Sequence, residues 1–113
     1  MPTPITLFSS KEEMERILDM YKIRKIRVED DYLCLVRTSK DVFVFEMGCP
    51  HMDYPLEKAN VNPFSEVICP WHGYRFDLIT GDESARRCRA LKVYHTRWSP
   101  HGQLLFDKPD AGT

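Results

Sequence analysis

Two short segments of the sequence each bring a cysteine and a histidine together. One residue separates Cys49 from His51, and two residues separate Cys69 from His72. A proline follows each cysteine and a glycine follows His72, so each segment is expected to form a tight loop. Thiolate and imidazole groups are common metal ligands. The two loops therefore offer four candidate ligands in two matched pairs.

Three interpretations of these four residues compete. In the first, two structural cysteines lie beside two surface histidines by chance. In the second, the four hold one structural zinc ion, although such sites usually take both cysteines from one segment and both histidines from another. In the third, they hold a [2Fe–2S] cluster in which two cysteines bind one iron and two histidines bind the other. The mixed pair in each loop favours the cluster, because each loop then reaches both irons.

The sequence resembles the Rieske-type ferredoxins. The blocks CPHMDYPL (49–56) and CPWHGYRFDLITG (69–81) carry the match, which extends more loosely from about residue 23 to about residue 107. The resemblance implies a mainly β protein with the Rieske fold, in which an antiparallel β base carries a cluster-binding subdomain of two loops. That subdomain is expected at about residues 47–80.

The resemblance also implies the ligands and their places. One [2Fe–2S] cluster is expected per chain. Cys49 and Cys69 would hold the buried iron, and His51 and His72 would hold the outer iron with their ring edges near solvent.

The two loops differ from those of high-potential respiratory relatives. Those relatives carry an extra cysteine in each loop, which together form a disulfide, and the matching positions here are Tyr54 and Trp71. They also place serine and tyrosine hydroxyls near the sulfurs, where this sequence has Tyr74 and Phe76. Fewer hydrogen bonds to sulfur stabilise an added electron less. The sequence therefore predicts a low-potential cluster. Trp71 and Tyr74 are expected to pack over it and exclude water.

Asp53 stands where the family usually has glycine, two residues after the first histidine. One interpretation is a turn residue, because aspartate tolerates the left-handed backbone better than most residues. The other is a carboxylate near the outer iron that lowers the potential further.

Hydrophobic segments on both sides of the loops predict the strands that position them. A helix is predicted over 9–20, because Ser10–Glu13 form a capping-box pattern and apolar residues follow at helical spacing. It departs from a family pattern that usually begins with a strand, and is expected to pack against the β base or to dock a partner. Strands are predicted at 23–28, 32–37, 42–47, 67–68, 74–78, 91–97 and 103–106, with a frayed tail at 108–113.

Length and composition limit the possible functions. The 113 residues and 13.3 kDa predict a single domain, 1–113. A net charge of −1 argues against a nucleic-acid partner. The sequence shows no apolar stretch of membrane-spanning length and no signal peptide, so we expect a soluble, cytoplasmic monomer.

The remaining cysteines and histidines are interpreted more simply. Cys34 alternates with apolar neighbours and is expected to be a buried thiol. Cys88 lies in the basic run 86–89, where cations can make a thiol reactive, and this run with Lys92 is either a solvated surface or a docking patch for an acidic partner. His95 and His101 are expected to be ordinary strand and turn residues.

The resemblance implies an electron carrier rather than an enzyme. Such ferredoxins pass electrons from a flavin reductase to a terminal oxygenase, often a ring-hydroxylating dioxygenase or a diiron monooxygenase. The length argues against an oxygenase catalytic subunit. The lack of a membrane anchor and of a loop disulfide argues against a respiratory subunit. The small subunit of a nitrite reductase and a zinc-stabilised interaction domain remain as alternatives.

Overall fold

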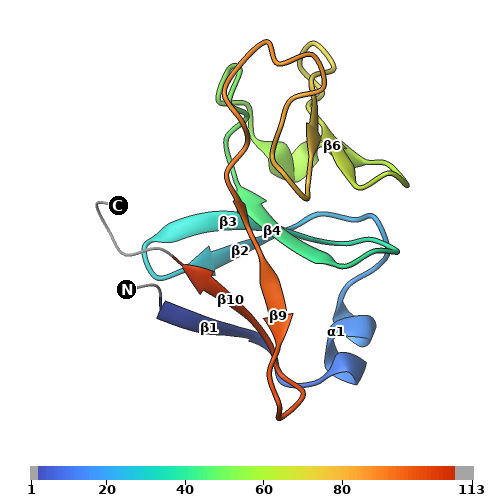
Figure 1. Ribbon diagram of the computed structural model, residues 1–113, viewed down its shortest axis with the longest axis vertical. Coiled ribbons are helices and arrows are strands. Elements are labelled where there is room, and N and C mark those ends of the chain that lie inside the picture. The colour runs from blue at the N-terminus through green and yellow to red at the C-terminus, as the bar shows by residue number, and fades with distance from the viewer. Residues whose placement is uncertain (1–2, 109–113) are drawn as a thin grey trace.

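The computed structural model describes residues 3–108, which form three antiparallel sheets and one α-helix (Figure 1). The first sheet has the strand order β1 (Thr3–Phe8), β10 (Leu104–Lys108), β9 (Thr96–Trp98). β1 therefore lies at an edge. Proline is tolerated in edge strands because its missing N–H is not needed by a neighbour, and Pro4 lies in this one.

The second sheet has the order β2 (Arg24–Val28), β3 (Asp31–Arg37), β4 (Val42–Glu46), β8 (Val93–Tyr94). Its central strands are buried on both faces, since four consecutive residues of β3 and four of β4 are buried. A strand with both faces covered must lie between two layers. In this molecule the layers are the first sheet with the helix on one side and the ligand loops on the other.

The third sheet is small and carries the loops. Its order is β5 (Asn60–Val61), β6 (Glu66–Ile68), β7 (Arg75–Asp77), and a 3₁₀ turn, Leu56–Lys58, precedes it. The second loop joins β6 to β7 as a hairpin connection, and the first loop follows directly after β4. Figure 1 shows these loops at one end of the molecule, with the segment after β7 running beside them.

Side-chain alternation along the second sheet divides the core into two clusters. Cys34, Val36, Phe43 and Phe45 face the loops and pack with Cys49, Leu56, Val67, Cys69, Phe76, Leu78 and Leu91. Leu33, Leu35, Val42 and Val44 face the other way and pack with Phe8, Met14, Leu18, Val28, Leu104 and Phe106. Both loop cysteines thus belong to the core itself, which fixes where the loops begin.

The helix α1 (Lys11–Ile17) is shorter than predicted but begins where the capping pattern placed it. Ser10 Oγ accepts a hydrogen bond from the Glu13 N–H at 3.1 Å. The Glu13 carboxylate reaches back to Ser9, whose N–H and hydroxyl both donate to it at 3.0 Å. Met14 and Leu18 bury the inner face of this segment, so α1 packs against the β base as expected.

Several strand predictions were wrong in detail. No strand was predicted before the helix, yet β1 begins the described part of the chain as the family pattern has it, and pairs with β10 from Thr3 to Phe8. The predicted strand 91–97 divides into β8 and β9, which belong to different sheets. β5 was not predicted. The predicted tail begins one residue too early, since Lys108 belongs to β10, and residues 109–113 lie outside the described part.

Within residues 3–108, no helix has the length and apolar character needed to cross a membrane.

Candidate metal centre

The two loops that carry the predicted ligands repeat one backbone pattern. In each, the cysteine N–H donates to the carbonyl five residues later, and the cysteine carbonyl accepts from the N–H four residues later. These bonds are Cys49 to Tyr54 (2.9 Å) and Asp53 to Cys49 (2.6 Å), then Cys69 to Tyr74 (2.8 Å) and Gly73 to Cys69 (3.1 Å). Since both loops close in the same way, each turns its cysteine inward and presents its histidine beyond it.

This repeat explains the aspartate in the first loop. Asp53 occupies the position of Gly73 in the second loop, and both have left-handed backbones, with φ of 56° and 70°. The turn-residue interpretation of Asp53 is therefore confirmed. Its Oδ1 also lies where a Cβ at Gly48 would be, so a side chain at residue 48 would require the Asp53 carboxylate to move. An effect of this carboxylate on the outer iron stays a prediction.

The two loop cysteines meet in the core. Cys49 and Cys69 are 2% and 0% exposed, and neither forms a disulfide. Burial raises the pKa of the Cys69 thiol to about 11. A hydrogen bond from the Trp71 N–H opposes this rise, and contact with the Cys49 thiol adds to it. Two adjacent buried thiolates are unfavourable alone, and a bound metal supplies the positive charge that stabilises them.

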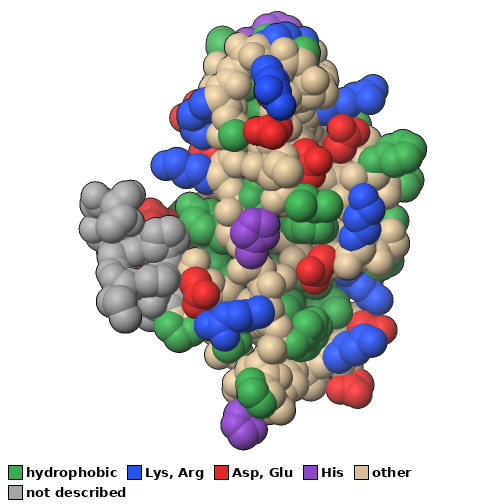
Figure 2. Space-filling model, viewed as in Figure 1, with side chains coloured by type: hydrophobic (Ala, Val, Ile, Leu, Met, Phe, Trp, Pro, Cys, Tyr) green, Lys and Arg blue, Asp and Glu red, His purple; other side chains and the backbone are tan. Residues whose placement is uncertain are grey.

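The histidines lie together on the outer side of the cysteines. The ring centroids of His51 and His72 are 5.3 Å apart and their planes are tilted by 58°. His51 Nδ1 is buried and has no hydrogen-bond partner, which is rare for a buried polar atom. A metal ion is a suitable partner for it, so the residues present fit the implied cluster. Figure 2 shows a histidine at this tip of the molecule, with Lys and Arg side chains nearby.

The arrangement suits two irons better than one zinc ion. Among residues 3–108, no three Cys, His, Asp or Glu side chains gather closely enough to hold a single metal ion. A structural zinc site requires four such ligands around one point. In a Rieske cluster each iron takes only two protein ligands and inorganic sulfide supplies the rest. Two paired thiols in the core and two paired rings outside them match this two-plus-two division of ligands.

Aromatic rings join the two loops. Tyr54 and Trp71 face each other with ring centroids 6.1 Å apart and an interplanar angle of 24°. A ring contact thus stands where high-potential relatives are expected to carry a disulfide. Tyr74 stacks on His51, with centroids 4.0 Å apart and planes 20° from parallel. Trp71 is 48% exposed, so it covers the site only in part.

A third segment beside the loops contains a carboxylate that the sequence analysis missed. Glu83 is 2% exposed. It accepts five hydrogen bonds: from Ser84 Oγ, Ala85 N, and Arg87 N, Nε and Nη2, at 2.8 to 3.2 Å. The bonds to Arg87 and to the backbone hold the pKa of Glu83 well below its ordinary value of 4.5. The four-residue spacing from Glu83 to Arg87 was the available sequence signal.

This lowered pKa predicts a pH dependence of stability. A carboxyl whose pKa is lower in the folded state stabilises the fold above its unfolded pKa and loses that effect as pH falls. We expect Glu83→Gln to lower the free energy of unfolding by about 2 kcal/mol at pH 7, with a smaller difference from the unchanged protein below pH 4.5. Urea unfolding at pH 7, 4.5 and 3.5 measures this. A difference that is constant over these pH values would contradict it.

Two arginines of the basic run form ion pairs within the chain, and the choice between a solvated surface and a docking patch stays a prediction. Arg87 pairs with Glu83, and Arg89 pairs with Glu46 through two bonds of 2.8 and 2.9 Å. Two of its three arginines are thus used within the chain. Burial raises the pKa of the Cys88 thiol, and the arginines only partly oppose this. The structure therefore gives no support for a reactive thiol at Cys88. Burial likewise raises the pKa of Cys34 to about 12, as expected of a core thiol.

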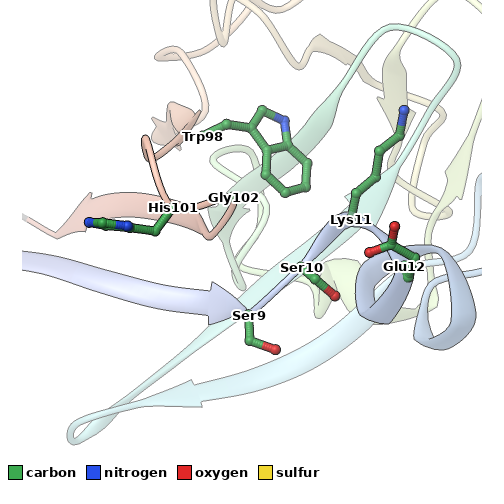
Figure 3. A pocket seen from close by; sticks show the side chains of 7 residues that line it. All are labelled: Ser9, Ser10, Lys11, Glu12, Trp98, His101 and Gly102. Atoms are coloured by element: carbon green, nitrogen blue, oxygen red, sulfur yellow. The ribbon is translucent and has the colours of Figure 1, made fainter.

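The other two histidines lie away from this site. His95 is exposed between β8 and β9. His101 lies in the turn between β9 and β10, at the end of the molecule opposite the ligand loops (Figure 1). It is one of the residues that line a hollow there. Its ring points away from Trp98 and the other side chains that line the hollow (Figure 3). The prediction of a turn residue at His101 agrees with this placement, whereas His95 lies between two strands and not within one as predicted.

Comparisons with known proteins agree with the geometry. The model of the Rieske [2Fe-2S] domain family matches residues 10–95. A curated relative, "Apoptosis-inducing factor 3" of Mus musculus, is 28% identical over 88 residues, which are 73% of this chain and 14% of that protein. The chain therefore spans about a seventh of the length of this relative.

Two solved structures show the same fold. The first is the ferredoxin of carbazole 1,9a-dioxygenase from Nocardioides aromaticivorans IC177, with a TM-score of 0.74, 23% identity, and coverage of 96% of this chain and 99% of that one. The second is described as an NADH-dependent nitrite reductase small subunit from Mycobacterium tuberculosis, with a TM-score of 0.76, 15% identity, and coverage of 98% and 99%. At these identities the likeness concerns the fold.

Proposed function

The chain belongs to the Rieske [2Fe-2S] domain family, and we propose that it is an electron carrier in which Cys49, His51, Cys69 and His72 hold the cluster. The [2Fe–2S] cluster is the cofactor of this family. One observation carries the assignment of the ligands. Two loops of the same backbone form bring two buried free thiols together, beside a histidine whose buried Nδ1 lacks a partner.

The side chains of the two loops have separate tasks. When bound, the cluster supplies a one-electron redox couple. Cys49 and Cys69 anchor it within the core, where water is excluded. His51 is only partly buried and His72 is exposed. The histidine edge is therefore the place where the redox centre of a partner comes closest.

The proposed partners are a flavin reductase as donor and a terminal oxygenase as acceptor. The fold is that of the ferredoxin of a dioxygenase, which matches this chain over nearly its whole length. None of the four cysteines forms a disulfide, which suits a reducing compartment such as the cytoplasm. We propose a cytoplasmic monomer that docks transiently.

A role in a nitrite reductase is the second candidate. The favouring observation is the nitrite reductase small subunit with a TM-score of 0.76. A small subunit acts within a larger enzyme, whereas a ferredoxin carries electrons between separate proteins. Electron transfer to an added acceptor therefore separates the two candidates.

The redox potential tests the proposed low-potential class. Phe76 is fully buried and offers no hydroxyl, and Tyr54 and Trp71 form a ring contact in place of a disulfide. We expect a midpoint below about +100 mV, within the range of roughly −150 to +300 mV known for Rieske centres. Spectroelectrochemical titration with EPR detection measures it. A midpoint above this limit would place the protein with the high-potential class and overturn the proposal.

Electron transfer tests the carrier role itself. The experiment measures NADH-driven reduction of cytochrome c by a flavin-dependent ferredoxin reductase of a dioxygenase system, with and without this protein. The rate is expected to rise in proportion to the concentration of cluster-loaded protein. The Cys69→Ala variant, which lacks one of the four proposed cluster ligands, is the matched control. A loaded protein that leaves the rate unchanged would argue against this role.

A further inference from the structure

Four side chains form a continuous stack that ends on a proposed ligand. Arg87 Cζ lies 3.7 Å from the ring centroid of Tyr74. The same ring stacks on His51, with the two ring centroids 4.0 Å apart. Glu83 holds Arg87 from behind through bonds of 2.9 Å to Nε and 2.8 Å to Nη2. The stack therefore crosses from the segment after β7 to both ligand loops.

The buried carboxylate fixes the guanidinium although the Arg87 side chain is 44% exposed. Its Nε and Nη2 form a bidentate pair along one edge, which leaves the flat face of the guanidinium free to lie on an aromatic ring. The carboxylate is itself held by the backbone N–H groups of Ala85 and Arg87. An isolated bridge joins Glu83 to Phe76 of β7. Arg87 is thus attached to the same strand that leads out of the second loop.

Ring stacking orients His51. A metal-bound histidine normally donates its second ring N–H to a carboxylate, a carbonyl or a water molecule, and this bond fixes the ring plane. Within the described part of the chain, no hydrogen bond to the ring of His51 is present. The nearly parallel Tyr74 ring takes that place. His72, in contrast, contacts its ring neighbours only at steep angles, 55° to Trp71 and 58° to His51.

We propose that Arg87 is a positioning residue that holds Tyr74 against His51, fixes the plane of this ligand, and turns the positive end of its ion pair with Glu83 toward the cluster. The inference rests on the proposed role of His51 as a ligand. A fixed ring plane gives one uniform iron environment. The positive end of this ion pair stabilises the reduced state, because reduction adds a negative charge nearby.

The test compares two arginines of the same basic run. Arg87→Gln removes the charge and the flat face. Arg89→Gln is the matched control, because Arg89 also forms a bidentate pair with a carboxylate, Glu46, through Nη1 and Nη2, and contacts no aromatic ring in the described structure. We expect Arg87→Gln to lower the equilibrium constant for reduction at least threefold, about 28 mV for one electron, and to broaden the EPR lines of the reduced cluster. Arg89→Gln should change neither.

Two tyrosine variants separate the ring from the charge. Tyr74→Phe keeps the ring and should preserve the EPR line width, whereas Tyr74→Leu removes it and should broaden the lines while Arg87 is still present. Equal effects of Arg87→Gln and Arg89→Gln, or unchanged line width in both Arg87→Gln and Tyr74→Leu, would overturn the inference. Iron and sulfide content confirms loading of every variant. If the proposed function is wrong, the unsubstituted protein itself shows no EPR signal of a cluster. This outcome differs from every outcome that tests Arg87.

Discussion

The Cys69→Ala variant is expected to lose the cluster. Cys69 is fully buried and its thiol contacts that of Cys49, so alanine leaves one iron with a single protein ligand and the core with a small gap. We expect iron and acid-labile sulfide to fall from about two of each per chain to near zero, with loss of visible absorbance and of the EPR signal after reduction. Chemical analysis and EPR on anaerobically purified protein measure both.

Cys34→Ala is the matched control for this experiment. Cys34 is equally buried, and its side chain lies in the same core cluster as the two proposed ligands. The two substitutions therefore remove the same atoms from equally buried positions, and only one of these positions is a proposed ligand. Cys34→Ala should keep the full cluster content. Equal cluster content in the two variants would show that the ligand assignment is wrong.

Cluster loss should also lower the stability of the fold. A group that binds only the folded state contributes its binding free energy to folding. The ligand loops contain little regular structure, and the cysteines at their base are central to the core beneath them. We expect Cys69→Ala to lower the midpoint temperature of thermal unfolding of the loaded protein. Cys34→Ala should lower it by less.

Gly81→Ala is expected to destabilise the protein by about 2–5 kcal/mol. Gly81 has φ of 86°, a left-handed conformation that is strained for alanine. A Cβ there would also collide with the carbonyl oxygen of Leu91, a backbone atom that cannot turn aside. Relief of the collision would pull apart the bond from Leu91 N–H to the Gly81 carbonyl, at 2.7 Å. Urea unfolding measures the change.

Gly102→Ala separates the two causes of this loss. Gly102 has nearly the same φ, 82°, but nothing lies within 4 Å of the position of its Cβ. Its substitution introduces the backbone strain without the collision, so we expect a loss of only about 1–2 kcal/mol. Equal losses in the two variants would show that contact with Leu91 contributes nothing.

Gly81 also matters for the site. The bond between Gly81 and Leu91 closes the segment that carries Glu83 and Arg87. The strain in Gly81→Ala is therefore transmitted to the stack on Tyr74. We expect this variant to broaden the EPR lines of the reduced cluster in the same direction as Arg87→Gln.

Much of the local structure could be predicted because it depends on neighbours in the sequence. The capping residues placed the start of α1, and short hydrophobic segments placed β2, β3 and β4. The turn character of Asp53 followed from the backbone preference of aspartate. The first strand could not be predicted in this way. β1 contains a proline and is stable only because β10, about a hundred residues later, pairs with it at the sheet edge.

Glu83 shows the same limit within the site. In the sequence it lies in a polar stretch that is typical of a solvated surface. Its burial depends on a bridge to β7 and on the return of Arg87 over Tyr74, contacts that arise only when the third segment folds along the two loops.

The sequence by itself determined the types of ligand, their spacing and the family, because metal affinity and tight turns depend on a few adjacent residues. The tertiary structure decided which side chains from separate segments face one another. It joined the two thiols in the core, set Tyr54 against Trp71 across the loops, and stacked Arg87 on Tyr74 and His51. These contacts depend on how three segments meet in space, and residue spacing along a chain does not specify that meeting.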